Sequence, residues 1–207
     1  MGLNEAVSAF VALFIIIDPI GLTPLFVALT RGATAEMRRR IATRAVLIAA
    51  LILALFGLFG EEVLSFVGIS MPAFRIAGGL LLFLTAIEML FERRSQRREK
   101  SAVLTDDPSV FPLATPLIAG PGAITTMILF AGRSHAPADY LVLGAAMLAV
   151  LALVLVLFFA GSLLERLLGH TGINVVTRLL GMLLAALSVQ FVLDGLRDFG
   201  LVPGGGG

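Results

Sequence analysis

The sequence predicts an all-α integral membrane protein whose six transmembrane helices form two inverted-topology repeats of three helices each. Three observations predict this fold class. Of the 207 residues, 58% are hydrophobic and 14% are charged, whereas a soluble domain is about 45–50% apolar and about 25% charged. The apolar residues fall into six stretches, and the two halves of the chain share a pattern of glycine, proline and polar positions. The composition excludes a water-soluble enzyme, and the absence of cysteine excludes a disulfide framework.

The six apolar stretches set the expected order of elements. A helix needs about 20 apolar residues to cross a bilayer, and lipid satisfies no backbone N–H or C=O group, so these stretches must be helical. The second stretch should stop at the polar Gly60-Glu61-Glu62. We expect one transmembrane domain over residues 1–203, with repeat one at about 1–91, a cytoplasmic linker at 92–110, repeat two at about 111–196 and a glycine tail at 204–207. The expected spans are about 6–29, 45–59, 74–91, 111–132, 140–164 and 179–196.

Basic residues cluster in alternate connections between these spans. Because cytoplasmic loops carry the excess of Lys and Arg, the odd-numbered connections are expected in the cytoplasm and both termini on the outer side. Clustered arginines also occur in nucleic-acid-binding proteins, but these clusters flank membrane spans, so we expect no nucleic-acid partner. The first and third connections hold Arg31, Arg38, Arg39, Arg40 and Arg44, then Arg93, Arg94, Arg97, Arg98 and Lys100.

The two halves of the chain match at an offset close to 102 residues. The segment 18–23 lies over 120–125, with Pro19 on Pro121 and Thr23 on Thr125. Because each unit has an odd number of helices, its copy must insert with the opposite membrane topology, as in many secondary transporters. Further along the chain, Gly60, Gly68, Arg75, Gly78 and Thr85 fall on Gly161, Gly169, Arg178, Gly181 and Ser188.

The first spans of both repeats carry helix breakers near their centres, Asp18-Pro19-Ile20-Gly21 and Gly120-Pro121-Gly122. Each site also reads as a helix start, with Asp18 or Gly120 as N-cap and proline at the first helical position. Free N–H groups at such a break suit a carboxylate, and the carbonyls of the preceding half-helix suit an ammonium. A small zwitterionic substrate fits both, while the alternative is a pair of structural proline kinks.

The candidate substrate-binding residues therefore lie at the two breaks. A charge at the centre of a span is costly and usually functional, so Asp18 is expected to bind an ammonium, carry a proton or help to hold Na⁺, unless it only caps a helix. The threonine hydroxyls either face the substrate or bond back to their own helix. These candidates are Asp18, Pro19, Gly21, Thr23, Gly120, Pro121, Gly122, Thr125 and Thr126.

A second group comprises candidates for coupling or gating: Asp18 again, Arg75, Arg178 and Gln190. The two arginines begin the third and sixth spans on opposite faces and either reach to the membrane surface or form a gate or carboxylate contact. Gln190 lies towards the end of the sixth span, and it either stays at that end or faces the cavity. His135 and His170 fall in connections, and we expect no metal site and no cofactor beyond a coupling H⁺ or Na⁺.

No sequence pattern for enzymatic chemistry is present. The chain has no G-x-x-x-x-G-K-[ST] loop for a nucleotide, and no Gly-x-Ser-x-Gly or His-Glu-x-x-His. We therefore expect a secondary transporter that works by alternating access. The alternative is a channel for a small solute or cation, because two half-helices that meet inside a membrane also build pores.

The two breaks also carry a family resemblance. Asp18-Pro19-Ile20-Gly21 with Pro24-Leu25-Phe26, and the long stretch 112–125 (PLATPLIAGPGAIT), resemble the signatures of the MarC family. Its members are multi-pass inner-membrane proteins of bacteria and archaea, including SnatA-type transporters. The resemblance implies transport of small neutral amino acids such as glycine or alanine, and leaves direction, coupling ion and homo-oligomerisation open. Family members often carry Asn where this chain has Leu22.

Overall fold

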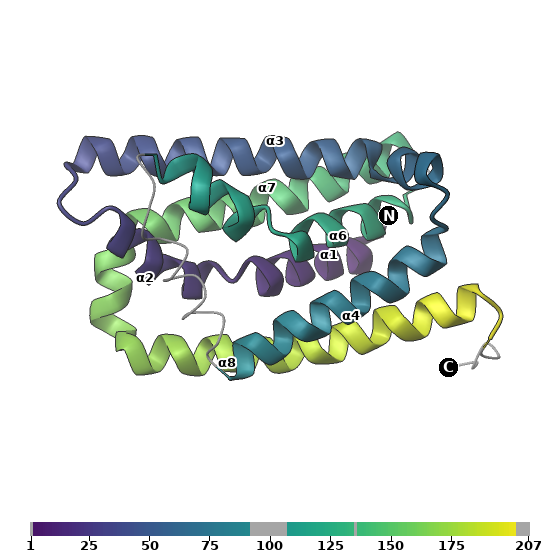
Figure 1. Ribbon diagram of the computed structural model, residues 1–207. Helices are drawn as coiled ribbons and strands as arrows, with labels where there is room; N and C mark the ends of the chain where they lie inside the picture. The colour runs from purple at the N-terminus through teal and green to yellow at the C-terminus, as the bar shows by residue number, and fades with distance from the viewer. Residues whose placement is uncertain (1, 92–106, 135, 202–207) are drawn as a thin grey trace.

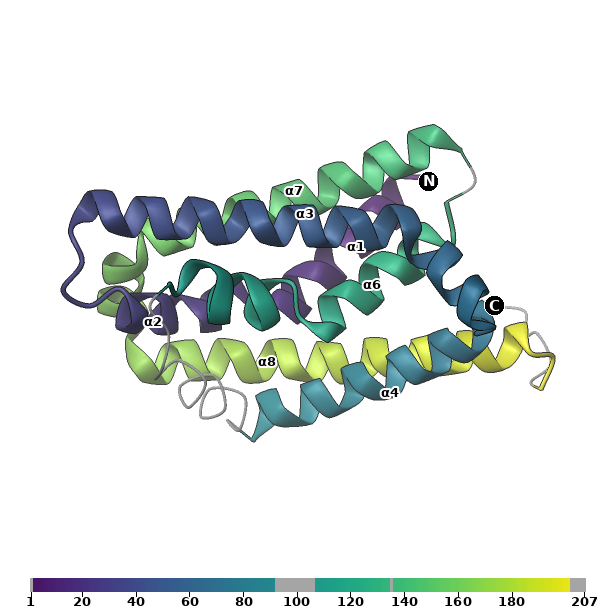
Figure 2. The same cartoon turned by 45° about the horizontal axis from the view of Figure 1, so that its top comes forward.

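The computed structural model describes residues 2–91, 107–134 and 136–201. Most of the predicted linker, with its five basic residues, lies outside these ranges, as do His135 and the glycine tail. The described chain is helical throughout, and its helices run back and forth along one long axis (Figures 1 and 2). The elements are α1 (Leu3–Ile17), α2 (Pro19–Leu29), α3 (Ala35–Val67), α4 (Met71–Leu90), the irregular helical segment η1 (Ser109–Ile118), α6 (Pro121–Ala131), α7 (Pro137–Phe159) and α8 (Gly161–Asp198).

The length and surface of the helices fit a bilayer. In the described residues, five helical stretches are long and apolar enough to cross a membrane, or six if the bent pair η1 and α6 is one span. Large apolar side chains cover the outside, including Leu47 on α3 at 66% exposed and Leu141 on α7 at 76%. Such a surface is costly in water and suits contact with lipid tails.

Two of the predicted boundaries are wrong. The second span does not stop at Gly60, because α3 continues through Glu61 and Glu62 for 33 residues. The two glutamates are exposed near the end of the helix, where their charge reaches water without breaking a backbone hydrogen bond. α3 ends at Gly68, whose φ of 82° places it in the left-handed region that closes a helix.

The expected connection between the fifth and sixth spans is also helical. α7 ends at Phe159, earlier than expected, and α8 then runs for 38 residues with one break at Gly169, where φ is 60°. His170 therefore lies in a helix, and its Nδ1 is 3.3 Å from the Asn174 amide nitrogen. A polar segment is compatible with a helix at the membrane surface, where only one side faces apolar neighbours.

η1 is held at its beginning by Asp107. The Asp107 carboxylate accepts hydrogen bonds from Ser109 Oγ at 2.5 Å and Ser109 N at 3.0 Å, and pairs with Arg44 of α3 at 2.6 Å. The Ser109 hydrogen bonds, with the nearby charges of Arg44 and Arg40, lower the pKa of the Asp107 carboxyl from its ordinary value of 3.8. The start of η1 is thus tied to the first turns of α3.

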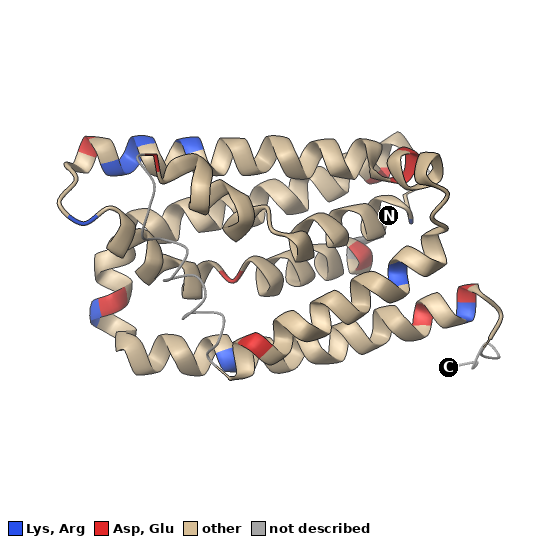
Figure 3. Cartoon of the chain, viewed as in Figure 1, with Lys and Arg blue, Asp and Glu red and all other residues tan. Residues whose placement is uncertain are grey.

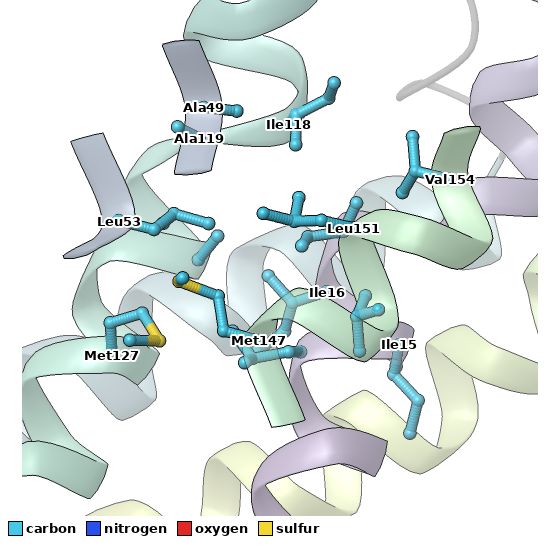
Figure 4. Close-up of a cluster of buried hydrophobic side chains, with 14 of the residues drawn as sticks. Ile15, Ile16, Ala49, Leu53, Ile118, Ala119, Met127, Met147, Leu151 and Val154 are labelled. Carbon is cyan, nitrogen blue, oxygen red and sulfur yellow. The ribbon is translucent and has the colours of Figure 1, made fainter. Parts of the chain in front are cut away.

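Figure 4 shows a cluster of buried apolar side chains in the core. Apolar side chains from α1, α3, α6 and α7 converge there with those at the end of η1. The labelled members of the cluster are Ile15, Ile16, Ala49, Leu53, Ile118, Ala119, Met127, Met147, Leu151 and Val154.

α4 and α8 form the most extensive helix pair and lie side by side in both views (Figures 1 and 2). Their close approach depends on glycine. A Cβ at Gly79 would lie 2.8 Å from the Ser188 carbonyl oxygen, and one at Gly181 would lie 3.3 Å from the Ala86 carbonyl oxygen. Glycine at these positions lets the two backbones pack closely inside the membrane.

Candidate functional site

Asp18 forms the junction between α1 and α2. Its backbone adopts the left-handed conformation (φ 56°, ψ 65°), which Asp tolerates better than most residues, and its N–H donates to the Phe14 carbonyl at 2.9 Å. Its carboxylate accepts a hydrogen bond from Gly21 N at 3.1 Å and so caps α2, while Pro19 occupies the first helical position. The predicted helix start is thus confirmed.

The Asp18 side chain is closed off from solvent, with an exposed fraction of 0%. Its second described partner is Thr177 of α8, whose Oγ1 lies 3.4 Å from Oδ1. Gly21 lines the same small space: a Cβ there would lie 2.2 Å from Asp18 Oδ2 and 2.9 Å from Thr177 Oγ1. Asp18, Gly21 and Thr177 form a compact polar group, which we call the Asp18 junction.

Thr177 was missed by sequence reasoning, which selected its neighbour Arg178. The match between the two halves could have drawn attention to Thr177, because an offset of 102 residues aligns Thr177 with Arg75. The Gly79–Ser188 and Gly181–Ala86 contacts follow this same offset. The one-residue shift matters because Thr177 is buried and Arg178 is exposed.

The threonines divide into two kinds. Thr23 Oγ1 donates to the Pro19 carbonyl at 2.8 Å, and Thr126 Oγ1 donates to the Gly122 carbonyl at 2.9 Å. These two hydroxyls therefore bond back to their own helices, which was the structural alternative. Thr125 is 6% exposed, its methyl group faces Gly78 of α4, and its hydroxyl makes no hydrogen bond within the described chain.

The second junction lies between η1 and α6, where the chain bends by 54°. Gly120 is the N-cap and Pro121 the first helical residue, as predicted, but Gly120 has no side chain to cap the helix. The N–H groups of Gly122 and Ala123 take part in no hydrogen bond among the described residues. Both residues are buried, so the start of α6 keeps two donors available for an anion.

The two junctions lie near each other but do not form one polar group. A Cβ at Gly122 would be 3.1 Å from Ile16 Cγ2 and 3.1 Å from Leu82 Cδ2, so the start of α6 meets the end of α1 through apolar atoms. Within the described residues, no hydrogen bond joins the Asp18 junction to residues 120–126. Leu22, where the family often has Asn, is fully buried at 0% exposed.

The gating candidates have different surroundings. Arg75 is buried at 8% exposed and forms an ion pair with Asp198 at the end of α8, so it makes a carboxylate contact within the chain. Gln190 is exposed and donates to Asp194 at 2.7 Å, so it does not face an internal cavity. The contact between Gln190 and Asp194 has the four-residue spacing of neighbours on one helix face, whereas the pair of Arg75 and Asp198 depends on how α4 packs against α8.

A second ion pair lies near the end of α8. Arg133, just after α6, pairs with Asp194 at 2.9 Å, and its guanidinium lies 5.7 Å and 5.9 Å from the ring centres of Phe130 and Phe191. Figure 3 shows charged residues mainly towards the two ends of the bundle, with others at the junction of α1 and α2 and where the end of α4 lies beside α8. In the described part of the chain, no three His, Asp or Glu side chains cluster as a metal site would require.

These observations define a polytopic helical membrane protein with a buried carboxylate at a helix junction inside its bundle. A comparison with known protein families matches residues 3–199 to the MarC family of integral membrane proteins. The chain belongs to the MarC family, and the resemblance seen at the two proline motifs is confirmed.

Individual relatives agree over nearly the whole chain. A UPF0056 membrane protein of Methanocaldococcus jannaschii is 40% identical over 202 residues, which cover 95% of this chain and 98% of the relative. The UPF0056 inner membrane protein YhgN of Escherichia coli K12 is 35% identical over 195 residues, which cover 94% and 98%. No solved structure matches the chain. Relatives thus occur in both archaea and bacteria, and their names describe membrane proteins.

Proposed function

We propose that this protein is a secondary transporter of small neutral amino acids, such as glycine or alanine, that works by alternating access with H⁺ or Na⁺ as coupling ion. The observation that carries the proposal is the Asp18 junction. A carboxylate with 0% exposure at the meeting point of two helices costs stability, and its capping role alone is one that serine or asparagine performs equally well. No enzymatic step is part of the proposal.

The chemistry of both junctions suits a zwitterion. The Asp18 carboxylate would attract an ammonium group, whereas the uncapped start of α6 offers buried N–H donors and the positive end of a helix dipole to a carboxylate. Thr125 lies one turn into α6 with a hydroxyl that has no partner within the described residues. In the present conformation the apolar contact between Ile16 and Gly122 separates the two groups, so substrate entry requires the junctions to move apart.

Reciprocal contacts support an inverted repeat. If two units are related by a two-fold axis, a contact between residue i and residue j of the other unit recurs with the roles exchanged. Gly79 meets Ser188 and Gly181 meets Ala86, and these pairs exchange at an offset of 102. The same reciprocity joins the other elements: Gly60 of α3 meets Ile128 of α6, and Gly161 of α8 meets Val27 of α2, at an offset of 101.

This symmetry favours alternating access. In an inverted repeat the two units can exchange conformations, which opens the site first to one side and then to the other. α4 and α8 meet across the proposed axis, and they would remain packed at their central contacts, Gly79 with Ser188 and Gly181 with Ala86, while the junction helices move. We also propose that the end with the start of α3 is cytoplasmic and that both termini are outside. The support is the distribution of charge, with Arg31, Arg38, Arg39, Arg40, Arg44 and Arg166 gathered at the cytoplasmic end.

The test is uptake of labelled glycine and alanine into proteoliposomes, with and without imposed H⁺ and Na⁺ gradients. We expect saturable uptake that depends on one of the gradients. Flux that does not saturate, or that reaches about a million molecules per second, would instead support the channel. No uptake of either amino acid by correctly inserted protein would refute this choice of substrate.

Asp18→Asn tests the role of the carboxylate. Asparagine still caps a helix, so folding and insertion should persist while gradient-driven uptake is lost. Asp139→Asn is the matched control, because Asp139 also binds a helix start, accepting from Ala136 N at 3.1 Å, but is only partly buried in the first turn of α7. Equal uptake by the two variants would show that Asp18 is only a helix cap.

A further inference from the structure

Arg75 and Asp198 join the start of α4 to the end of α8. The Arg75 side chain is 10% exposed and that of Asp198 is 43% exposed, so the pair has one buried member and one member open to water. Asp198 contacts the terminal nitrogen Nη1 of the guanidinium. The Arg75 Nε atom is buried and has no hydrogen-bond partner within the described chain.

The position of Arg75 connects this pair to the interior. On the same face of α4, one turn further along, Gly78 packs against Thr125 of α6 and Gly79 packs against α8. Arg75 therefore lies at the outer end of the line where α4, α6 and α8 meet. The same line leads inward past Thr125 to Gly122, at the start of α6, which meets Leu82 of α4.

We propose that Arg75 is a carboxylate-binding subsite in which Asp198 takes the place of the substrate carboxylate. This inference rests on the proposed function and names a first contact for its substrate. A guanidinium presents parallel N–H donors that match both oxygens of a carboxylate. Asp198 reaches one terminal nitrogen and leaves the Nε donor unsatisfied, which is costly for a buried group. A small free carboxylate is not tied to a helix end. It can bind the edge formed by Nε and Nη2 with both oxygens, and it then competes with Asp198 for the single positive charge of the guanidinium.

Binding at this subsite has a mechanical consequence. When a carboxylate displaces Asp198, the ion pair between α4 and α8 at this end of the bundle is lost. Close by, Gly195 of α8 lies on Ile76, with a Cβ position 2.7 Å from Ile76 Cγ1. Displacement of Asp198 therefore releases the end of α8 at the moment the substrate arrives. An ion pair that served only to hold the two helices together would show no such competition.

The test measures how acetate stabilises the purified protein in lipid nanodiscs. The thermal unfolding midpoint is recorded at rising acetate concentration, with sodium chloride replaced so that ionic strength is constant and with methylammonium chloride as the cation control. Bound ligand raises the midpoint according to its dissociation constant. We expect acetate to raise the midpoint of the wild-type protein, methylammonium to leave it unchanged, and Arg75→Gln to abolish the effect of acetate.

Asp198→Asn separates competition from a structural role. Removal of the internal competitor should lower the apparent dissociation constant for acetate about fivefold, equivalent to about 1 kcal/mol. Asp194→Asn is the matched control, because Asp194 pairs with the more exposed Arg133 at the same end of α8, and it should leave the constant unchanged. An unchanged or weaker affinity in Asp198→Asn, or no response to acetate in the wild type, overturns the proposal. If the protein responds to acetate but takes up neither glycine nor alanine, the carboxylate-binding subsite is supported and the proposed function is refuted.

The chain offers an independent readout because it contains no cysteine. In an Ile76→Cys background the only thiol lies in the contact between α4 and α8, and its reaction rate with neutral methyl methanethiosulfonate reports separation of the two helices. Acetate should raise this rate in the otherwise wild-type protein. With Asp198→Asn added, the rate should be high from the start. A slow rate in both proteins, with or without acetate, contradicts release of α8.

Discussion

Replacement of Gly21 by alanine tests whether the Asp18 carboxylate must lie against the start of α2. A Cβ at this position would be 2.2 Å from Asp18 Oδ2 and 2.8 Å from Asp18 Cγ. Both distances are far below van der Waals contact, so the carboxylate must turn away from Gly21 N, its hydrogen-bond donor at 3.1 Å. Thr177 Oγ1, 2.9 Å from the same Cβ position, blocks movement toward α8.

The expected size of the effect follows from three contributions. Loss of a helix cap costs about 1 kcal/mol, and crowding in a packed interior costs about 1–3 kcal/mol. Alanine in place of glycine recovers about 1 kcal/mol of helix propensity. We expect a net loss of about 1–3 kcal/mol for Gly21→Ala, together with loss of gradient-driven uptake.

The assay is thermal unfolding in nanodiscs with Gly144→Ala as the control. Gly144 lies inside α7, and a Cβ there meets nothing within 4 Å, so this variant should gain about 0.5–1 kcal/mol. The difference of about 1.5–4 kcal/mol between the two variants should separate their midpoints by about 3–16 °C. If Gly21→Ala is as stable and as active as Gly144→Ala, the Asp18 carboxylate does not need its position against α2, and the reasoning about the junction fails.

Two further predictions concern packing and pH. Gly60→Ala should destabilise the protein by about 1–3 kcal/mol, because its Cβ would lie 2.4 Å from Ile128 Cγ1. The double variant with Ile128→Ala should lose less stability than the two single variants added together. Simple additivity of the two losses would show that this contact is unimportant. Asp107→Asn should lower the unfolding midpoint at neutral pH, because the lowered pKa of Asp107 means that its ionised form stabilises the fold above the ordinary value of 3.8. The difference from the wild type should shrink as the pH falls through the lowered pKa, and a difference that stays constant down to full protonation would refute this role.

Composition and hydropathy were sufficient to predict the class of fold. The apolar stretches indicate membrane helices because backbone polar groups in lipid leave few alternatives. Local chemistry also predicted both helix starts after the breaks, since Asp18 with Pro19, and Gly120 with Pro121, are strong start signals. The end of α3 and the start of α8 were not predictable from apolarity. A helix accommodates charged residues such as Glu61 and Glu62 wherever one of its sides reaches water.

The side-chain partners depend on tertiary structure. Asp18 was recognisable as a candidate site residue from its position in an apolar span, but its partner Thr177 lies 159 residues further along the chain. Likewise, Arg75 was selected from sequence, whereas its pairing with Asp198 depends on how α4 and α8 cross. Hydropathy averages over a helix turn, so it does not distinguish the buried Thr177 from the exposed Arg178 beside it.

The length of α3 determines how deeply the protein sits in the bilayer. At 1.5 Å per residue its 33 residues extend about 50 Å, whereas the hydrocarbon core is about 30 Å thick. The first turns of α3 therefore extend beyond the hydrocarbon, where Arg38 lies 5.8 Å above the ring of Phe26 and Arg39 lies 5.9 Å from the ring of Phe159. Both arginines lie in the basic first turns of α3. The helix that contributes Gly60 to the interior is thus longer than the hydrocarbon core is thick, and it also reaches the polar region of the membrane.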